Sequence, residues 1–547
     1  MPRLGLVAFA GVIAYLVLLP LYRLQQLALS DGAAAYGKAF SAERMSATLG
    51  TTVALALGSL VIATVFGTGL AWAATRLPTR LRFLRVVPIM PIVIPAVAAV
   101  TGWAFLFSPR PGYLNAMLRL LPWWDHLDAG PVDVYTVPWI VLLTGFGLTS
   151  FMYLFVTAGL SGINAELIEA AQASGSSAWG VVFKVTLPLL RPTLVYGGGV
   201  ALLLGLGQFT APLLLGSNSG VDVLTTDMYR AVVESPVDYA KAAAIGSPLL
   251  LFGVVVVLAQ KLLLGDQRRF VTHGGKGFKV SHRPSRLATF TIIVYGFVAL
   301  VLPLAALGLV SLSKFWSANI VLSELTLDNF RTVLDKPNVA NAVINSLGMS
   351  ILTVAIALPV GFVASLLLLR GRRYRVIRSL VDFIVAIPLG IPAVIFGAGF
   401  LFAYTRGPLV LYGTRWVILL VYLTLMLPFT VRMQLAGLVA IGDTYTEASR
   451  TSGAGPLRTN LRIVLPLLRP TLGGAGALMF VLLTHEFAAS LLVRSPTTQV
   501  MGTVLFDFWR NGSYPTVAAI AMIMTVVTGV GVGAATLLGG TGIVDQL

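Results

Sequence analysis

Long apolar runs separated by short polar segments are the main pattern along the 547 residues of this chain. Each run supplies roughly the 20 apolar residues that a helix needs to cross the hydrocarbon core of a bilayer. Helices are expected because an open strand edge leaves backbone N–H and C=O groups without partners in lipid. The pattern predicts about twelve transmembrane helices, over residues 4–22, 48–75, 86–108, 138–160, 193–216, 244–264, 288–312, 343–369, 380–404, 416–438, 471–493 and 515–540.

A polar, basic stretch divides the predicted helices into two sets of six. It reads DQRRFVTHGGKGFKVSHRPSR and covers residues 266–286. We therefore predict an all-α polytopic membrane protein. Its first half is expected at 1–265, a cytoplasmic linker at 266–287, and its second half at 288–547.

The composition fits a chain that is largely surrounded by lipid. Hydrophobic residues make up 57% and charged residues 11% of the sequence, and the mean hydropathy is +0.88. Soluble domains carry about 25% charged residues. The absence of cysteine excludes disulfide frameworks, thiolate metal sites and cysteine nucleophiles. The four histidines are too widely spaced to suggest a metal cluster, so we assign no metal site.

The net charge of +17 would suggest a nucleic-acid partner in a soluble protein. Here the basic segments RLPTRLRFLR and RGRRYRVIR and the linker all fall on one side of the predicted helices. Cytoplasmic loops carry such an excess of Lys and Arg. We therefore expect both termini in the cytoplasm and no nucleic-acid partner. The first apolar run is followed by no small-residue cleavage site, so it is predicted to be an uncleaved span.

The two halves repeat each other in sequence. VTLPLLRPTL at 185–194 returns as IVLPLLRPTL at 463–472, which is 278 positions later. The segment IPAV also occurs twice, at 94–97 and 391–394. Because six is an even number, both halves enter the membrane in the same sense. The repeat is therefore predicted to be parallel, with a pseudo-twofold axis along the membrane normal.

The best-matched part of the repeat is the loop between the fourth and fifth predicted helices of each half. In the first copy, Asn164 is expected to be the N-cap of a short helix that ends at a left-handed Gly175. Ser177 is expected to cap a second short helix, which Pro188 would end because the residue before a proline disfavours helical geometry.

The second copy predicts the same bent pair of helices with different residues. Asp443 takes the first N-cap position and Gly453 the left-handed position. Gly455 and Pro456 begin the second short helix, where proline lacks only an N–H that would be unpaired anyway. Pro466 is expected to end that helix. An amphipathic helix that merely links two spans is the alternative for this loop.

This loop carries the pattern Glu-Ala-Ala, three residues, Gly, a spacer and then Leu-Pro. By this pattern the chain resembles the permease subunits of bacterial ABC importers, in which the pattern marks a cytoplasmic coupling loop. The second copy departs from the family's pattern only at Ser449, which replaces one small residue by another. The residues that match the pattern are Glu169, Ala170, Ala171, Gly175, Leu187 and Pro188 in the first half, and Glu447, Ala448, Ser449, Gly453, Leu465 and Pro466 in the second.

The resemblance implies that each loop is seated in a cleft of a cytoplasmic ATPase subunit. Glu169 and Glu447 would be polar contacts, the small residues the packing face, and the two glycines the bend. It further implies two ATPase subunits, an external substrate-binding protein and a location in the bacterial inner membrane. ATP and Mg²⁺ would bind to the ATPases. The chain contains no GxxxxGK[ST] loop, so we expect a transport subunit without catalytic residues and without a cofactor of its own.

Two stretches, at 211–230 and 485–506, carry a narrower resemblance to the fused, double-length permeases of ferric-iron and thiamine systems. This resemblance implies a type I importer that moves a small solute inward by alternating access. Ferric iron is the favoured cargo. Thiamine, a polyamine, a phosphonate or sulfate are the alternatives.

Ionisable residues inside a span are costly and often functional. His485 and Glu486 lie in the predicted span at 471–493, and Gln208 is the first-half counterpart of Glu486. In one interpretation these residues line the translocation path or an outer gate, where Glu486 would favour a cation. In the other, Glu486 bonds to a neighbouring helix or lies at the outer interface.

Three further features have structural interpretations. Asp382 is expected to form a surface ion pair near RGRRYRVIR, and Arg432 to extend toward the cytoplasmic interface. Trp123 and Trp124 are expected to anchor an outer loop to the membrane, with contact to a binding protein as the alternative.

Two other classes of protein are alternatives to a permease. An ion-coupled secondary transporter can also have six plus six helices, but it would be expected to carry several intramembrane carboxylates, and Glu486 is the one good candidate. A membrane enzyme would need paired carboxylates, zinc-spaced histidines or a nucleophile elbow, and the sequence contains none of these patterns.

Overall fold

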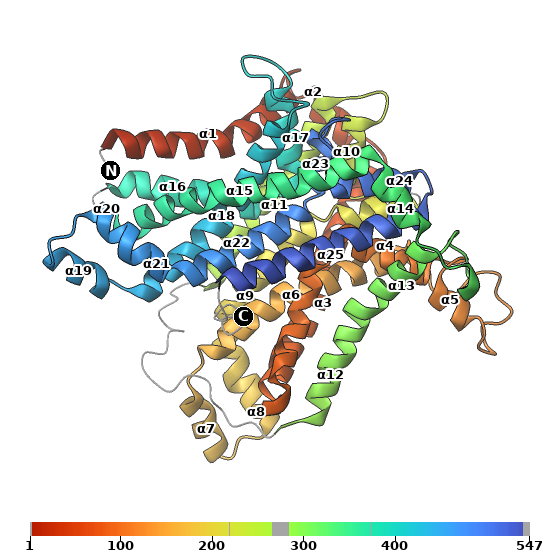
Figure 1. Ribbon diagram of the computed structural model, residues 1–547, viewed down its shortest axis with the longest axis horizontal. Helices are drawn as coiled ribbons and strands as arrows, with labels where there is room; N and C mark the ends of the chain where they lie inside the picture. The colour runs from red at the N-terminus through yellow and green to blue at the C-terminus, as the bar shows by residue number, and fades with distance from the viewer. Residues whose placement is uncertain (1–2, 218, 265–283, 372–373, 540–547) are drawn as a thin grey trace. The chain divides into compact units, whose positions relative to one another are not determined.

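The computed structural model describes residues 3–217, 219–264, 284–371 and 374–539, and within these ranges every regular element is a helix (Figure 1). This confirms the predicted all-α class. The predicted linker lies almost entirely outside the described residues.

Nine of the predicted spans are single helices in the described residues, long and apolar enough to cross a bilayer. Two of the nine are helices that continue through a π-helical turn. The nine are α1 (Arg3–Ala28), α3 (Met45–Thr75), α6 (Val137–Ser161), α8–η2–α9 (Ala178–Val181, Val182–Thr186, Leu187–Leu206), α11 (Tyr239–Leu264), α12–η5–α13 (Arg286–Gly296, Phe297–Val301, Leu302–Leu312), α15 (Pro337–Arg370), α18 (Arg415–Ile441) and α25 (Tyr514–Gly539).

The other three predicted spans, at 86–108, 380–404 and 471–493, fall on bent pairs of helices. The pairs are η1 and α4 (Thr79–Val93, Ala96–Phe107; 93°), α16 and α17 (Arg375–Gly390, Ala393–Tyr404; 110°), and α20–η8–α21 and α22 (Pro456–Thr459, Asn460–Val464, Leu465–Leu467, Arg469–Thr484; 68°). The third pair begins before its predicted range, and its second helix ends at Thr484, within that range. The remaining short elements are α2 (Ala34–Phe40), α5 (Tyr113–Leu118), α7 (Ala165–Ala173), η3 (Pro212–Gly216), α10 (Leu224–Val233), η6 (Leu322–Glu324), α14 (Asp328–Asp335), α19 (Thr444–Thr451), α23 (Ala488–Val493) and α24 (Met501–Arg510).

The first two bends have the same local cause. Ile94 and Ile391 each precede a proline, and both adopt extended backbone angles, with ψ of 127° and 128°. The proline ring disfavours helical geometry at the preceding residue. The next residues, Pro95 and Pro392, are the N-caps of α4 and α17. The repeated sequence IPAV therefore encodes a repeated bend.

The described residues form two compact units that do not coincide with the halves of the sequence. Unit 1 is built from 1–42, 227–247 and 325–547, and unit 2 from 43–226 and 248–324. The first span of each half thus packs with most of the other half: α1 belongs to unit 1, and α12–η5–α13 belongs to unit 2. The predicted boundaries of the sequence repeat stay a prediction.

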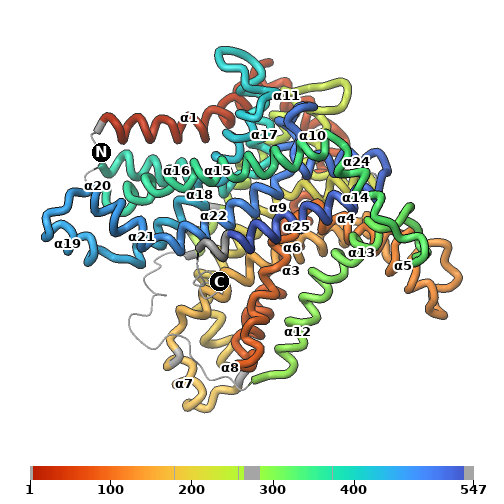
Figure 2. The backbone as a smooth tube through the Cα atoms, viewed as in Figure 1, coloured from red at the N-terminus to blue at the C-terminus, as the bar shows by residue number. Residues whose placement is uncertain are grey.

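Unit 2 is centred on the pairing of α3 with α6. The helices approach closely at Gly67, where a Cβ would lie 2.7 Å from Cβ of Met152, and at Gly145, which lies against Ile62. Small residues allow such close approach inside membranes. A buried apolar cluster extends from this contact to Ile168 in α7 and Val181 in α8. Figure 2 shows α7 and α8 at one end of the unit and α5 at the other.

Unit 1 has α15 paired with α18 in the same way. Gly361 of α15 lies under Thr430 and Gln434 of α18. The Gln434 amide donates to the Leu358 carbonyl at 3.0 Å.

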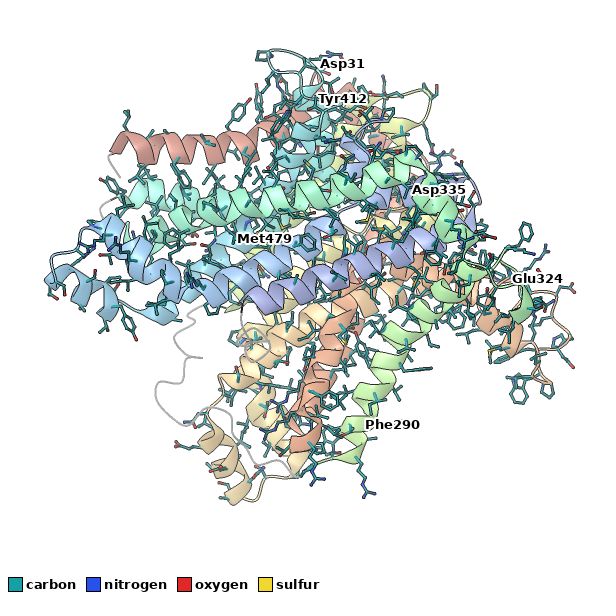
Figure 3. All side chains as sticks on the ribbon, viewed as in Figure 1. Asp31, Phe290, Glu324, Asp335, Tyr412 and Met479 are labelled. Atoms are coloured by element: carbon teal, nitrogen blue, oxygen red, sulfur yellow. The ribbon has the colours of Figure 1, made fainter. Side chains whose placement is uncertain are left out.

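Met479 of α22 is fully buried, whereas Phe290 of α12, in unit 2, is 63% exposed (Figure 3). Exposed apolar side chains of this kind are expected on helices that face lipid.

Candidate functional site

Two short helices, α7 in unit 2 and α19 in unit 1, carry the predicted coupling residues. Each is followed by a glycine in the left-handed region, with φ of 82° at Gly175 and 80° at Gly453. A Cβ at either glycine would meet nothing within 4 Å. Glycine is therefore favoured at these positions because of the left-handed backbone conformation, and not because a side chain would clash with neighbouring atoms. Both predicted bends are confirmed.

The predicted caps are formed in three of four places. The Asn164 side chain accepts from the Glu166 N–H at 3.0 Å, and the Ser177 hydroxyl accepts from the Gly180 N–H at 3.1 Å. Gly455 occupies the N-cap of α20 and Pro456 follows as its first residue.

Asp443 departs from the predicted pattern. It occupies the N-cap position of α19, but its side chain makes no capping bond. Its carboxylate lies 3.7 Å from the Arg370 guanidinium instead. The Asp443 backbone has helical angles (φ −94°, ψ −18°) and not the extended angles typical of a capping residue, so the prediction of a side-chain cap is wrong for this copy.

The prediction that Pro188 ends the second short helix is wrong. The helix runs from Trp179 through the π-helical turn η2 to Leu206. At the end of the π turn, the Leu187 N–H donates to the Val182 carbonyl, five residues earlier. This widened turn adapts the helix to a residue that has no N–H.

The second copy bends, but two residues later than predicted. Pro466 lies inside α21, and the 68° bend falls at Leu468, just before Pro470. The prediction that Pro466 ends this helix is therefore wrong in position.

The two helices of each coupling loop are held together by different residue pairs. In unit 1, the hydroxyl oxygens of Ser449 and Thr459 lie 2.8 Å apart, and both side chains are buried. The positions 278 residues earlier hold Ala171 and Val181, which belong to the same apolar cluster. An apolar pair in one copy thus replaces a hydrogen-bonded pair in the other.

The small residues of the motif do not share one face. Ala170 and Ala448 are exposed, whereas Ser449 is buried against its own unit. Glu169 and Glu447 are exposed, as are Pro188 and Pro466. On the helices α7 and α19, the acidic residue and the first small residue of each motif are therefore available to a partner.

Large apolar side chains are exposed around each motif at matching positions. They are Leu167 (40%), Trp179 (73%) and Phe183 (62%) in unit 2, and Tyr445 (55%), Leu457 (73%) and Leu461 (54%) in unit 1. Each member of the second set lies 278 positions after its counterpart in the first. We call these six residues the apolar sets. Sequence analysis missed them, although their shared offset was visible in the repeat.

Glu486 caps the short helix α23. One carboxylate oxygen accepts from the Ala489 N–H at 2.8 Å, and the other accepts from the Ser490 N–H at 2.8 Å and from the Ser490 hydroxyl. The Ser490 hydroxyl also lies 3.0 Å from the Tyr422 hydroxyl of α18. Ser490 and Tyr422 were missed by sequence analysis.

The other two predicted pathway residues are also bonded locally. His485 Nε2 lies 2.9 Å from the Thr528 hydroxyl of α25. The main-chain carbonyl of Gln208 accepts from the Thr225 hydroxyl at 2.5 Å. These contacts give the His485 side chain and the Gln208 main chain structural partners. Whether they also line a path stays a prediction.

The structure also gives the surroundings of Asp382 and Trp123, for which the sequence predicted structural roles. Asp382 forms the predicted surface ion pair, and its partner at 2.8 Å is Arg432. Trp123 is 62% exposed in the loop after α5. This loop is held by Asn115, whose side-chain amide donates to the Phe107, Ser108 and Val132 carbonyls.

Comparison with protein families adds an independent observation. A family model described as "Binding-protein-dependent transport system inner membrane component" matches the chain twice, over residues 63–269 and 357–539. The matches cover more than half of the chain.

Individual relatives are similar at moderate identity. The ferric transport system permease protein FbpB of Actinobacillus pleuropneumoniae is 26% identical over 85% of this chain and 67% of its own length. A probable ABC transporter permease protein, y4fN of Sinorhizobium fredii, is 27% identical over 95% of this chain and 92% of its own length. A putative 2-aminoethylphosphonate transport system permease protein, PhnV of Salmonella typhimurium, is 29% identical over 44% of this chain and 88% of its own length.

A solved structure of a bacterial ABC transporter involved in alginate import is 20% identical over 46% of this chain and 93% of its own, with a TM-score of 0.39.

Proposed function

Because the chain belongs to the family of binding-protein-dependent transport system inner membrane components, in two copies, we propose that two cytoplasmic ATPase subunits drive it through α7 and α19. In this proposal the chain supplies two permease halves of an importer, and each half provides one docking surface.

The duplicated surface of the coupling loops carries this proposal. An exposed glutamate, an exposed alanine and an apolar set recur 278 positions apart, although the residues beneath them differ. The contact between the two helices of each loop is kept by different residues, the pair Ala171–Val181 in one copy and the pair Ser449–Thr459 in the other. A surface linker would need no repeated exposed pattern, whereas two equivalent partners would.

The first coupling loop is connected to the membrane by an unbroken helix. Motion of α7 would reach α8 through the buried cluster around Ile168 and Val181, and α8 continues into α9. In the second loop the Ser449–Thr459 bond links α19 to α20, and the bend at Leu468 follows. Displacement of each loop by ATP-driven closure of the ATPases would therefore move the span behind it.

The proposed orientation places α7, α19 and both termini in the cytoplasm. Exposed basic side chains accompany the coupling loops, among them Lys184, Arg450, Arg458 and Arg462. An excess of such residues marks cytoplasmic segments. The opposite ends of the units would then meet an external substrate-binding protein, as the family's description implies.

Ferric iron is the proposed cargo, because a relative that matches most of this chain is named a ferric transport permease. The phosphonate permease is similar over less of the chain. Selection would reside chiefly in the external binding protein. Uptake of radiolabelled ferric iron in cells that express the complete system, set against uptake of a phosphonate, tests this part.

The coupling proposal is tested by reversing both exposed charges. In Glu169→Lys with Glu447→Lys, we expect normal membrane insertion, loss of co-purifying ATPase and loss of ATP-driven uptake. The matched control is Asp125→Lys with Asp335→Lys, which reverses two exposed charges outside the coupling loops. It should retain the ATPase. Equal ATPase recovery in both double variants would refute the proposal.

A further inference from the structure

Helix α16 has three distinct faces around its circumference. With about 3.6 residues per turn, its residues separate into one buried group and two exposed groups. Val381, Ile384, Val385 and Pro388 are buried in unit 1. Val376 (73% exposed), Leu380 (51%) and Phe383 (67%) form an apolar exposed face. Arg375, Arg378, Ser379 and Asp382 form a polar face beside it, and none of the four is buried.

The polar face is completed by Arg432 of α18. The Arg432 guanidinium and the Asp382 carboxylate lie 2.8 Å apart, and their side chains are 42% and 50% exposed. Figure 1 shows α16 running alongside α15 and α18 in unit 1, against both of which it packs. The ion pair is therefore open to whatever surrounds that side of the helix pair.

The depth of this ion pair argues against lipid as its surroundings. Helix α18 has 27 residues, which is about 40 Å at 1.5 Å per residue, compared with a hydrocarbon core of about 30 Å. Arg432 lies nine residues before the end of α18 at Ile441. That is about 14 Å from the helix end, and therefore about 4–14 Å inside the hydrocarbon core, depending on how the roughly 10 Å by which α18 exceeds the core is divided between its two ends. A half-exposed ion pair at this depth is costly in lipid but not in water.

Unit 2 shows the same division in η1. Arg82 and Arg85 occupy the positions that correspond to Ser379 and Asp382, and both are exposed. Phe83 and Val86 correspond to Leu380 and Phe383, and both are exposed as well. Each half thus places a polar strip and an apolar strip side by side before its bend. A helix that faces only lipid would need the apolar strip alone.

We propose that the polar face of α16, together with Arg432, lines a water-filled and positively charged part of the translocation path in unit 1. The inference rests on the proposed transport function and adds a chemical class of cargo. Three arginines against one aspartate leave this face with a net positive charge. A positive surface in a confined, water-filled passage attracts anions and repels cations. The solute that crosses here is accordingly one that carries negative charge, including a metal held as an anionic complex.

The absence of cysteine in the chain allows a direct test. Single variants Ser379→Cys and Leu380→Cys place a thiol on the polar and the apolar face, one residue apart. The purified proteins are reconstituted in lipid nanodiscs, which leave both membrane faces open, and treated with the anionic reagent sulfonatoethyl methanethiosulfonate. We expect labelling of the thiol at 379 and protection at 380. Equal labelling, or protection of both, would overturn the proposal.

A second pair of variants, deeper in the membrane, distinguishes a water-filled passage from the lipid headgroup region as the surroundings of this face. Ala386 lies on the same face as Ser379, seven residues further along α16, and Ile387 lies on the apolar face. If water fills a passage, Ala386→Cys should be labelled and Ile387→Cys should not. Labelling at 379 without labelling at 386 would mean that the arginines lie among lipid headgroups, and the proposal would fail.

The charge is tested with a second reagent, the cationic trimethylammonioethyl methanethiosulfonate. The reaction rate of each reagent with Ser379→Cys is divided by the rate of the same reagent with a small free thiol. This normalised rate should be roughly threefold higher for the anionic reagent than for the cationic one. Adding Arg378→Gln should reduce that preference. A preference for the cation would overturn the assignment of cargo charge. None of these measurements needs an ATPase, so a failed coupling proposal would leave their outcome unchanged.

Discussion

Gly399 of α17 lies directly against the carbonyl oxygen of Pro20 in α1, so that a Cβ at Gly399 would stand 2.7 Å from that oxygen. The same relationship joins Gly102 of α4 to Pro303 of α13, at 2.6 Å. In each unit, the first span of one half therefore packs on the bent span of the other half through a glycine and a proline. Each contact lies inside one unit, where it joins a segment from the first half of the chain to a segment from the second half.

Gly399→Val should destabilise unit 1, because the valine side chain has to displace backbone atoms of α1. Overpacking of this kind costs about 1–3 kcal/mol. The thermal unfolding midpoint of the purified protein should fall. Gly529→Val is the control, since a Cβ at Gly529 meets nothing within 4 Å. Equal midpoints for the two variants would contradict the packing account.

The Ser449–Thr459 bond can be replaced by the pair found in the other half. Thr459→Val alone leaves the buried Ser449 hydroxyl without this partner, which costs about 1–3 kcal/mol. Adding Ser449→Ala recreates the pair Ala171–Val181 and should restore most of the loss. Hydrogen–deuterium exchange of peptides that cover α19 and α20 measures the effect. If the double variant exchanges faster than Thr459→Val, the two pairs are not equivalent.

Glu486→Gln tests whether the carboxylate is a cap or a cargo ligand. The substitution replaces one of two acceptor oxygens by an NH₂ group, so one capping interaction of α23 is lost. We expect a loss of about 0.5–2 kcal/mol in unfolding free energy and unchanged ATPase association. Ser490→Ala removes the hydroxyl that donates to Glu486 and should lower the midpoint in the same direction. Altered cation transport at unchanged stability would instead support the pathway role.

The sequence predicted features that depend on local chemistry. Left-handed Gly175 and Gly453 follow from the need for a helix stop, and Ser177 and Gly455 from the need for a cap. Among the described residues, the long apolar runs located the nine single-helix spans and fell on the three bent pairs, because a segment that crosses lipid must supply such a run.

Features that depend on packing between distant segments could not be predicted in this way. Apolar content does not distinguish a straight span from a 110° bend, although Pro392 marks the place. The exchange of first spans depends on shape matching such as that between Gly399 and Pro20. The sequence shows that Glu486 is an ionisable residue in an apolar run, but it does not show that the carboxylate is satisfied by Ser490, only four residues away.

The apolar sets provide a test of the docking surface that does not alter charge. Trp179→Ala with Leu457→Ala should raise the dissociation constant of the ATPase about tenfold or more, because large apolar side chains dominate binding at interface centres. Trp123→Ala is the matched control, because it truncates an exposed tryptophan in the loop after α5, and Figure 2 shows α5 at the other end of unit 2 from α7. Binding assays on immobilised permease measure both. A similar affinity for all three proteins would exclude the apolar sets from the interface.

The most direct test of the account is the mass of the complex between this chain and its ATPase. Native mass spectrometry of the co-purified, detergent-solubilised complex should give one copy of the chain with two ATPase subunits, because each half carries one coupling loop. A folded chain that binds a single subunit, or none, would contradict the account.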